Sequence, residues 1–248
     1  MTELVHLDVA DGVATITLDS PHNRNALSKQ LVTELAAHLT TADADTESKA
    51  ILIRTSGPVF CSGADLTEAV GGGMAEGAKA IIVLQRQIAT AAKPVVVELG
   101  GPVRAGGLGI VGAADLVIAA ESVTFQLTEV RLGLAAAIIS ASLIPRFNPR
   151  AASDLFLTAR TFDAAEAAAV GLVTRAVPDA DLSAEVARVL ADLAKAYPQG
   201  LRESKAILNR DLVARIDALG NDLAAKSAEL FASDEAREAM TAFLQRKK

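Results

Sequence analysis

The stretch from Gly106 to Gly112 reads GGLGIVG and carries glycines at close spacing. Gly107, Gly109 and Gly112 match the G-x-G-x-x-G pattern of a dinucleotide-binding turn, in which glycines let the backbone approach a pyrophosphate. Such a turn also needs a full helix after the glycines, and here a strand-like segment begins almost at once, after Asp115. A strand-helix-strand crossover takes about a dozen residues. A nicotinamide site is therefore disfavoured, which leaves close packing or another anion to explain the glycines.

A second glycine-containing loop indicates a different chemistry. The segment PVFCSGADL, residues 58–66, leaves a predicted strand and places Ser62, Gly63, Ala64 and Asp65 just before a helical pattern. Backbone N–H groups at the start of a helix have no intrahelical partner, so two such loops could direct a pair of donors at one oxygen atom. The residues alone leave two interpretations open, an oxyanion hole or ordinary turns.

The composition excludes several classes of function. Thirty acidic against 24 basic residues give a net charge of -6 and hence no electrostatic surface for nucleic acid, and 3% aromatic residues leave few platforms for bases. One cysteine, Cys61, cannot form an intramolecular disulfide, and with three scattered histidines it makes no zinc-binding pattern. Because no apolar run is long enough for a bilayer and the N-terminus does not resemble a signal peptide, we expect a cytoplasmic protein without a membrane partner.

The elements that must position these loops alternate between strands and helices. The opening residues predict a hairpin that turns at Asp11 and Gly12, and leucines at positions 27, 31, 35 and 39 predict an amphipathic helix that Ser28 caps. Buried strands are expected in KAILIRTS, PVVVELGG and DLVIAA, so the pattern predicts an α/β fold. From about residue 181 the pattern is helical. We therefore expect a core over residues 1–180 and a helical region over residues 181–248, where the apolar face of AEVARVLADLAKA would meet another subunit.

Five segments together resemble the successive signatures of the crotonase superfamily, the enoyl-CoA hydratase/isomerase family. They are PHNRNALS (21–28), FCSGADL (60–66), KPVVVELGGPVRAGGLGIVGAADLVIA (93–119), FQLTEVRLGL (125–134) and ASDEAREAMTAFLQRKK (232–248). The similarity covers nearly the whole chain in order. It implies a spiral of strand-strand-helix turns with a C-terminal helical oligomerisation region, in a homo-oligomer, a trimer or hexamer, that acts on acyl-CoA.

The resemblance also implies roles for particular residues. The N–H groups of Ala64 and Gly106 would hold the thioester oxygen, and Glu129 would transfer protons. Hydratases of this family commonly carry another glutamate three residues beyond the oxyanion glycine, and that position here is Gly109, which cannot move a proton. Contacts with the CoA ester are implied for Arg24, Ala26, Ser62, Asp65, Leu66, Gly107 and Arg246. Arg104, which departs from the family's usual small or apolar residue, is a further candidate.

Some of these side chains have structural interpretations as well. Asp65 is expected to cap the helix that follows it rather than to act in catalysis. Arg24 and the C-terminal Arg246 are the local cations that an acidic protein needs for the phosphates of CoA. Arg104 either forms an ion pair with Glu98 or binds a polar or carboxylated acyl tail.

The reaction itself has two interpretations. One carboxylate suffices to move a proton between carbons, as in an isomerase that converts 3-enoyl-CoA to 2-enoyl-CoA, whereas addition of water uses two carboxylates more naturally. The segments GLGIVGAAD and FQLTEVRLGLAAAIIS nevertheless resemble single-glutamate bacterial hydratases of the methylglutaconyl-CoA type. We therefore rank hydration of a 2-enoyl-CoA, as in fatty acid metabolism, ahead of isomerisation. An acyl-CoA-binding protein without catalysis is the alternative of another class. No metal or cofactor is expected, since coenzyme A is part of the substrate.

Overall fold

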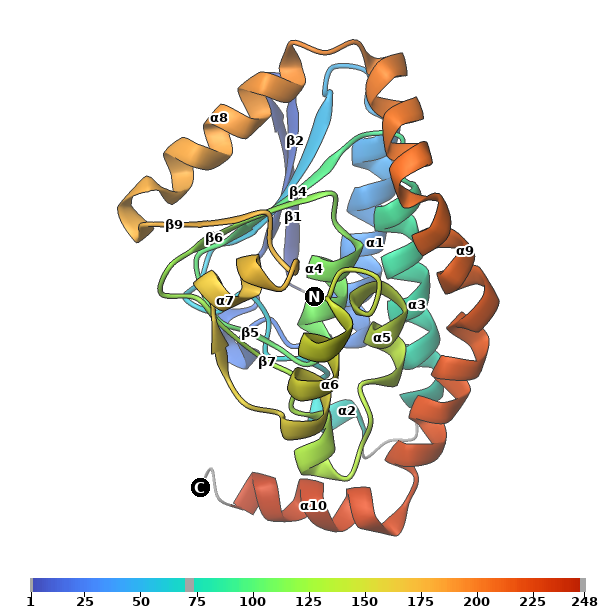
Figure 1. Ribbon diagram of the computed structural model, residues 1–248. Coiled ribbons are helices and arrows are strands. Elements are labelled where there is room, and N and C mark those ends of the chain that lie inside the picture. The colour runs from blue at the N-terminus through green and yellow to red at the C-terminus, as the bar shows by residue number, and fades with distance from the viewer. Residues whose placement is uncertain (1, 70–73, 246–248) are drawn as a thin grey trace.

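A parallel sheet with one antiparallel edge strand forms the centre of the molecule (Figure 1). The computed structural model describes residues 2–69 and 74–245. The spatial order of the strands is β1 (Val5–Ala10), β2 (Val13–Leu18), β3 (Ala50–Thr55), β4 (Val95–Leu99), β6 (Leu116–Ala120) and β9 (Arg175–Val177). The predicted hairpin is confirmed, because β1 and β2 pair antiparallel and Asp11 and Gly12 both have positive φ, at 51° and 77°.

A smaller sheet lies beside the first. It contains β5 (Val103–Arg104), β7 (Thr124–Gln126) and β8 (Phe162–Asp163), with β5 and β7 parallel. The rings of Phe125 and Phe162 stack across it with centroids 5.4 Å apart. The chain thus passes from β4 in the large sheet to β5 in the small one and on through a helix to β6, which is the expected strand-strand-helix turn.

Helices cover the sheets and make up every described element after β9. Their bounds are α1 (Lys29–Ala44), α2 (Leu66–Ala69), α3 (Met74–Thr90), α4 (Gly107–Ala113), α5 (Ala137–Leu143), α6 (Pro149–Thr158), α7 (Ala164–Ala169), α8 (Leu182–Ala194), α9 (Pro198–Phe231) and α10 (Asp234–Gln245), with short 3-10 helices η1 (Pro21–Asn23), η2 (Glu129–Leu132) and η3 (Asp179–Asp181). Ser28 caps α1 as predicted, since its side chain accepts a hydrogen bond from the Leu31 N–H at 3.2 Å. No described helix is long and apolar enough to cross a membrane.

The C-terminal helices pack on the core of their own chain. Val186 and Val189, on the apolar face of α8, are buried in the main hydrophobic core. The expectation that this face meets another subunit is therefore wrong, because the sheet of the same chain already covers it. Helix α9 runs along α3 (Figure 1), where Lys205 is buried and its Nζ lies 2.7 Å from Oδ2 of Asp115.

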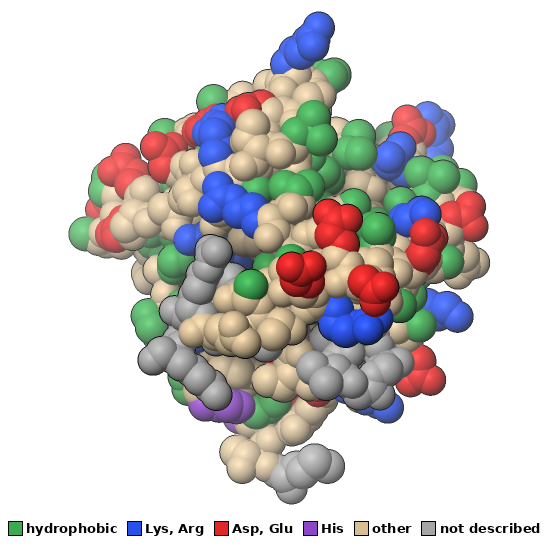
Figure 2. Space-filling model, turned by 90° about the horizontal axis from the view of Figure 1, so that it is seen from below, with side chains coloured by type: hydrophobic (Ala, Val, Ile, Leu, Met, Phe, Trp, Pro, Cys, Tyr) green, Lys and Arg blue, Asp and Glu red, His purple; other side chains and the backbone are tan. Residues whose placement is uncertain are grey.

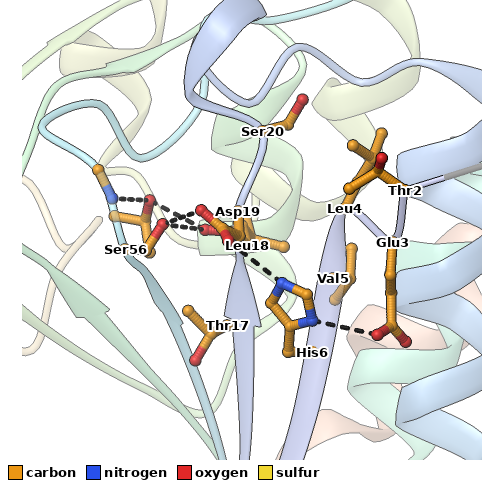
Figure 3. Close-up of polar contacts among 12 residues, drawn as sticks. Thr2, Glu3, Leu4, Val5, His6, Thr17, Leu18, Asp19, Ser20 and Ser56 are labelled. Carbon is orange, nitrogen blue, oxygen red and sulfur yellow. Dashed lines mark hydrogen bonds and ion pairs between the residues drawn. The ribbon is translucent and has the colours of Figure 1, made fainter.

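A polar network anchors the end of β2, from which the next loop leaves (Figure 3). His6 contacts Glu3 through Nδ1 at 3.1 Å and Asp19 through Nε2 at 3.2 Å, and the Ser56 hydroxyl donates to Asp19 at 2.5 Å. The hydrogen bond with Glu3 raises the pKa of His6, and the bond from Ser56 lowers the pKa of Asp19. The network fixes the chain directly before Ser20, where the segment that carries Arg24 begins.

Candidate active site

The two glycine loops of the sequence lie side by side. The Phe60 N–H donates to the Pro102 carbonyl at 3.1 Å, and the Arg104 N–H donates to the Cys61 carbonyl at 2.9 Å. These bonds form a short parallel pairing between residues that are more than 40 positions apart. The pairing carries the segment after β3 and the segment after β4 to the same place.

Glycine is required at this junction for steric reasons. Gly63 has φ +95°, and a Cβ built on it would lie 2.9 Å from the Cβ of Ala105 and 3.7 Å from the Gly106 nitrogen. A Cβ on Gly107 would lie 2.7 Å from the Cβ of Cys61. The distances of 2.9 Å and 2.7 Å are too short for two carbon atoms that are not bonded to each other. Any larger residue at either position would therefore force the loops apart. Close packing thus accounts for Gly63 and Gly107.

Two backbone donors remain where the loops meet. No described residue accepts a hydrogen bond from the N–H of Ala64 or of Gly106. A Cβ on Gly106 would stand 3.8 Å from the Ala64 nitrogen, so the two groups are neighbours. Ala105, directly before the second donor, has φ +45°, a conformation that costs a non-glycine residue about 1–3 kcal/mol and is found most often at functional sites. The arrangement has the character of an oxyanion hole.

A third segment, residues 20–28, supports the first loop. The Leu27 N–H donates to the Gly63 carbonyl at 2.8 Å, and the Ser62 N–H donates to the Arg24 carbonyl at 3.1 Å. The Ser62 hydroxyl donates to the Asn23 carbonyl at 3.1 Å. Because these bonds hold both sides of the loop, the Ala64 donor has a fixed position.

Sequence reasoning missed the importance of the asparagines in this segment. Asn25 is buried with φ +52°, accepts the Ser20 N–H at 2.7 Å and donates to Thr55 and to the Val59 carbonyl. The pattern N-x-N was available as a signal, because asparagine adopts positive φ more readily than most residues. Its long-range partners could not be read from the sequence.

Glu129 is the titratable side chain that best fits proton transfer. It begins η2, which is separated from the end of β7 by two residues, and its Oε2 is buried without a hydrogen-bond partner among the described residues. Burial raises the pKa of the Glu129 carboxyl to about 7. No ion pair joins it to Arg131 in the described part of the chain. A carboxyl with these properties can both accept and donate a proton near neutral pH.

Packing leaves no room for a side chain at Gly109, the position that matches the family's other glutamate. Gly109 is buried inside α4, and a Cβ on it would stand 2.9 Å from Cγ2 of Ile139 and 3.2 Å from Cδ of Gln85. The structure therefore offers Glu129 alone, of the two expected positions, for acid-base chemistry.

The remaining predicted contact residues lie around the first loop. Asp65 caps α2 as expected, because its carboxylate accepts the Thr67 N–H at 3.0 Å, and it also accepts a bond from Asn23 at 3.2 Å. Ala26 is buried below the loop, and Leu66 is half-buried at the start of α2. Arg24 is exposed with φ +59°.

Arg104 does not form the ion pair considered for it with Glu98 among the described residues, and its contact with an acyl tail stays a prediction. Its guanidinium donates to the Thr124 carbonyl at 2.5 Å and to the Thr124 hydroxyl at 2.8 Å, which ties β5 to β7. Glu98 lies on β4, where burial raises the pKa of its carboxyl and nearby Arg54 opposes that shift. The ion pair between Glu98 and Arg104 is absent from the described structure.

Arg246 lies outside the described residues, as do Lys247 and Lys248. Figure 2, which views the molecule from below, shows acidic and basic side chains close together near the centre of this face. On α10, Arg237 pairs with Asp234 at 3.1 Å. Positive and negative side chains are thus mixed on this surface. Of the two arginines expected to bind the CoA phosphates, Arg24 is the one that the structure describes.

No group of three or more His, Cys, Asp or Glu side chains in the described residues is arranged to hold a metal ion.

The fold defines the class, an α/β protein with strand-strand-helix turns, in which two backbone donors without a described acceptor lie where the glycine loops meet. The chain belongs to the enoyl-CoA hydratase/isomerase family, the crotonase superfamily, since residues 8–248 match its model. It is 41% identical to an enoyl-CoA hydratase from Mycobacterium avium, whose crystal structure superposes with a TM-score of 0.92 and covers 99% of this chain and 98% of that one.

Curated relatives show both the family and its range of chemistry. A Thermus thermophilus protein named as an enoyl-CoA hydratase is 35% identical over 202 residues, 79% of this chain and 80% of the relative. A 4-chlorobenzoyl coenzyme A dehalogenase from Arthrobacter is 32% identical over 211 residues, 81% of this chain and 76% of the relative. Both names refer to a CoA thioester, but each refers to a different reaction.

Proposed function

We propose that this protein adds water to a 2-enoyl-CoA thioester. Glu129 carries the proposal, because its Oε2 is buried without a described partner and burial raises the pKa of its carboxyl to about 7. The hydratase names of the Mycobacterium avium and Thermus thermophilus relatives support the choice of reaction. Acyl-CoA is the substrate class, and the proposed chemistry needs no metal or redox cofactor.

The mechanism uses one carboxyl group for both proton transfers. The Glu129 carboxylate takes a proton from water as the water oxygen bonds to C3 of the substrate. The electrons of the double bond move onto the thioester oxygen, where the N–H groups of Ala64 and Gly106 stabilise the enolate. The Glu129 carboxylic acid then returns the proton to C2, which restores the carboxylate. Loss of one such backbone donor typically costs about 3–4 kcal/mol in the barrier.

Isomerisation is a second candidate, which the packing at Gly109 favours. Without a carboxylate at that position, Glu129 could take a proton from C2 of a 3-enoyl-CoA and return it to C4, and no water would be needed. Loss of the C2 proton forms a dienolate, and the N–H groups of Ala64 and Gly106 would stabilise its oxygen as they would in hydration. Binding without catalysis is less well supported, since a buried carboxyl with a raised pKa is costly to keep without a use.

A panel of 2-enoyl- and 3-enoyl-CoA esters tests these alternatives. Hydration removes the conjugated thioester chromophore, whereas migration of a 3-enoyl double bond creates it. We expect hydration of 2-enoyl esters by the wild type and its loss in Glu129→Gln. Migration without hydration would select the isomerase, and tight binding with no turnover of any ester would overturn both enzymatic proposals.

A further inference from the structure

The face of α4 beside the candidate oxyanion donor is closed by packing. Gly109 lies one turn after Gly106, and its N–H donates to the Gly106 carbonyl at 3.0 Å. Residues three apart on a helix share a face, so a side chain at position 109 would lie on the face of α4 that carries Gly106. The 2.9 Å approach of a Cβ on Gly109 to Cγ2 of Ile139 shows that this space is already filled.

The filling groups come from two other helices and are held in place. Ile139 of α5 and Gln85 of α3 are both fully buried. The Gln85 amide donates to the Ile138 carbonyl at 3.1 Å and accepts a bond from the Ser142 hydroxyl at 2.6 Å. Because donor and acceptor are both satisfied, the amide has one preferred orientation. Neither Ile139 nor Gln85 carries a titratable group.

We propose that Ile139 and Gln85 are specificity-determining residues. They form a plug against Gly109 that occupies the place where another acid-base group, or a water activated by it, would stand. Proton transfer is thereby left to Glu129. This inference rests on the proposed function and extends it, because it names the residues that restrict the reaction to one carboxyl group.

The plug is tested first by stability. Gly109→Glu should lower the Tm, since its Cβ cannot fit against Ile139. Ile139→Ala should also lower the Tm, because it leaves a cavity. The double variant should nevertheless have a higher Tm than Gly109→Glu, because alanine removes the Cγ2 atom that blocks the new side chain.

Leu143→Ala supplies a matched control. Leu143 is fully buried on the same helix but faces Gly112, where a built Cβ would stand 2.9 Å from its Cδ2. Leu143→Ala should therefore fail to raise the Tm of Gly109→Glu. If the Gly109→Glu, Ile139→Ala double variant has a Tm at or below that of Gly109→Glu, the proposal that Ile139 blocks position 109 is wrong.

Activity then tests the effect on specificity. In the folded Gly109→Glu, Ile139→Ala double variant, the ratio of hydration to double-bond migration should rise at least about tenfold over the wild type, because a carboxylate would enter beside the enolate. An unchanged ratio would overturn the role in specificity. If the wild type processes neither class of ester, the proposed function is wrong, while the comparison of Tm values still decides whether the plug exists.

Discussion

Gly63 and Ala105 face each other with positive φ angles, +95° and +45°, at the point where the two donor loops meet. A Cβ on Gly63 would approach the Ala105 Cβ to 2.9 Å. The neighbouring residues in the chain are Ala64 and Gly106, whose N–H groups form the candidate oxyanion hole. The distance between the two donors therefore depends directly on the absence of a side chain at position 63.

Gly63→Ala should impair the chemical step more than substrate binding. The new methyl group pushes the loops apart and strains the backbone, at a cost of about 1–3 kcal/mol in unfolding free energy. If one donor loses its alignment, kcat should fall by roughly a hundredfold, with a smaller change in KM. Steady-state kinetics and urea unfolding measure the two effects.

Gly200→Ala is the control for this substitution. A Cβ on Gly200, in the first turn of α9, meets nothing within 4 Å, so both kinetics and stability should be preserved. Wild-type kcat in a folded Gly63→Ala variant would show that the spacing of the loops does not matter for turnover.

Glu129→Gln should remove the acid-base group while keeping its shape. We expect kcat to fall at least about a hundredfold, with acyl-CoA affinity little changed. In the wild type, kcat/KM should rise with pH through about 7, because the carboxylate is the base in the first step. If kcat/KM does not change between about pH 6 and 8, Glu129 is not the base in the first step.

The same carboxyl should make stability depend on pH. Its pKa of about 7 in the folded protein lies above its ordinary value of 4.5, so the folded state holds the proton more tightly than the unfolded state does. Stability should therefore be highest below about pH 4.5 as far as this group is concerned, and fall as the pH rises through about 7. The loss is on the order of 1–3 kcal/mol, and Glu129→Gln should abolish it.

Urea unfolding of both proteins at about pH 5 and pH 8 measures this difference. Glu121→Gln changes an exposed carboxylate and should leave the pH dependence as in the wild type. Identical pH dependence in the wild type and Glu129→Gln would mean that the Glu129 carboxyl is solvated in the folded protein.

Arg24→Gln should weaken acyl-CoA binding if this exposed cation meets the CoA phosphates. We expect a loss of roughly three- to tenfold at low salt, which shrinks at high salt as the charges are screened. Calorimetry with a saturated acyl-CoA gives the affinity. Arg210→Gln removes another exposed arginine, on α9 and paired with Asp211, and should have no effect. Equal losses from both variants would indicate a nonspecific effect of net charge.

The protein should form a trimer, as the family resemblance implies. Helix α9 carries two adjacent exposed apolar side chains, Ile207 and Leu208, which are exposed by 75% and 81%. Large apolar side chains that lie close together on a surface favour contact with another protein. Light scattering should give a trimeric mass that Leu208→Asp reduces. A monomeric wild type at micromolar concentration would refute the prediction.

Local signals in the sequence determined much of the fold. The turn at Asp11 and Gly12, the cap at Ser28 and the cap at Asp65 each depend on residues a few positions apart, so the sequence alone predicted them correctly. The order of strands and helices followed from periodicity for the same reason. The motif segments also identified the family, which the comparisons confirmed.

Tertiary structure decided what depends on contacts between distant residues. The burial of Glu129 and its raised pKa arise from packing around η2, and no property of the segment LTEV by itself determines them. The sequence of α8 predicts an apolar face that is free for a partner, whereas in the structure the core of the same chain covers this face. Likewise, only the packing of α3 and α5 shows that Gly109 faces Ile139 and Gln85, because a glycine in the sequence does not reveal which side chains occupy the space beside it.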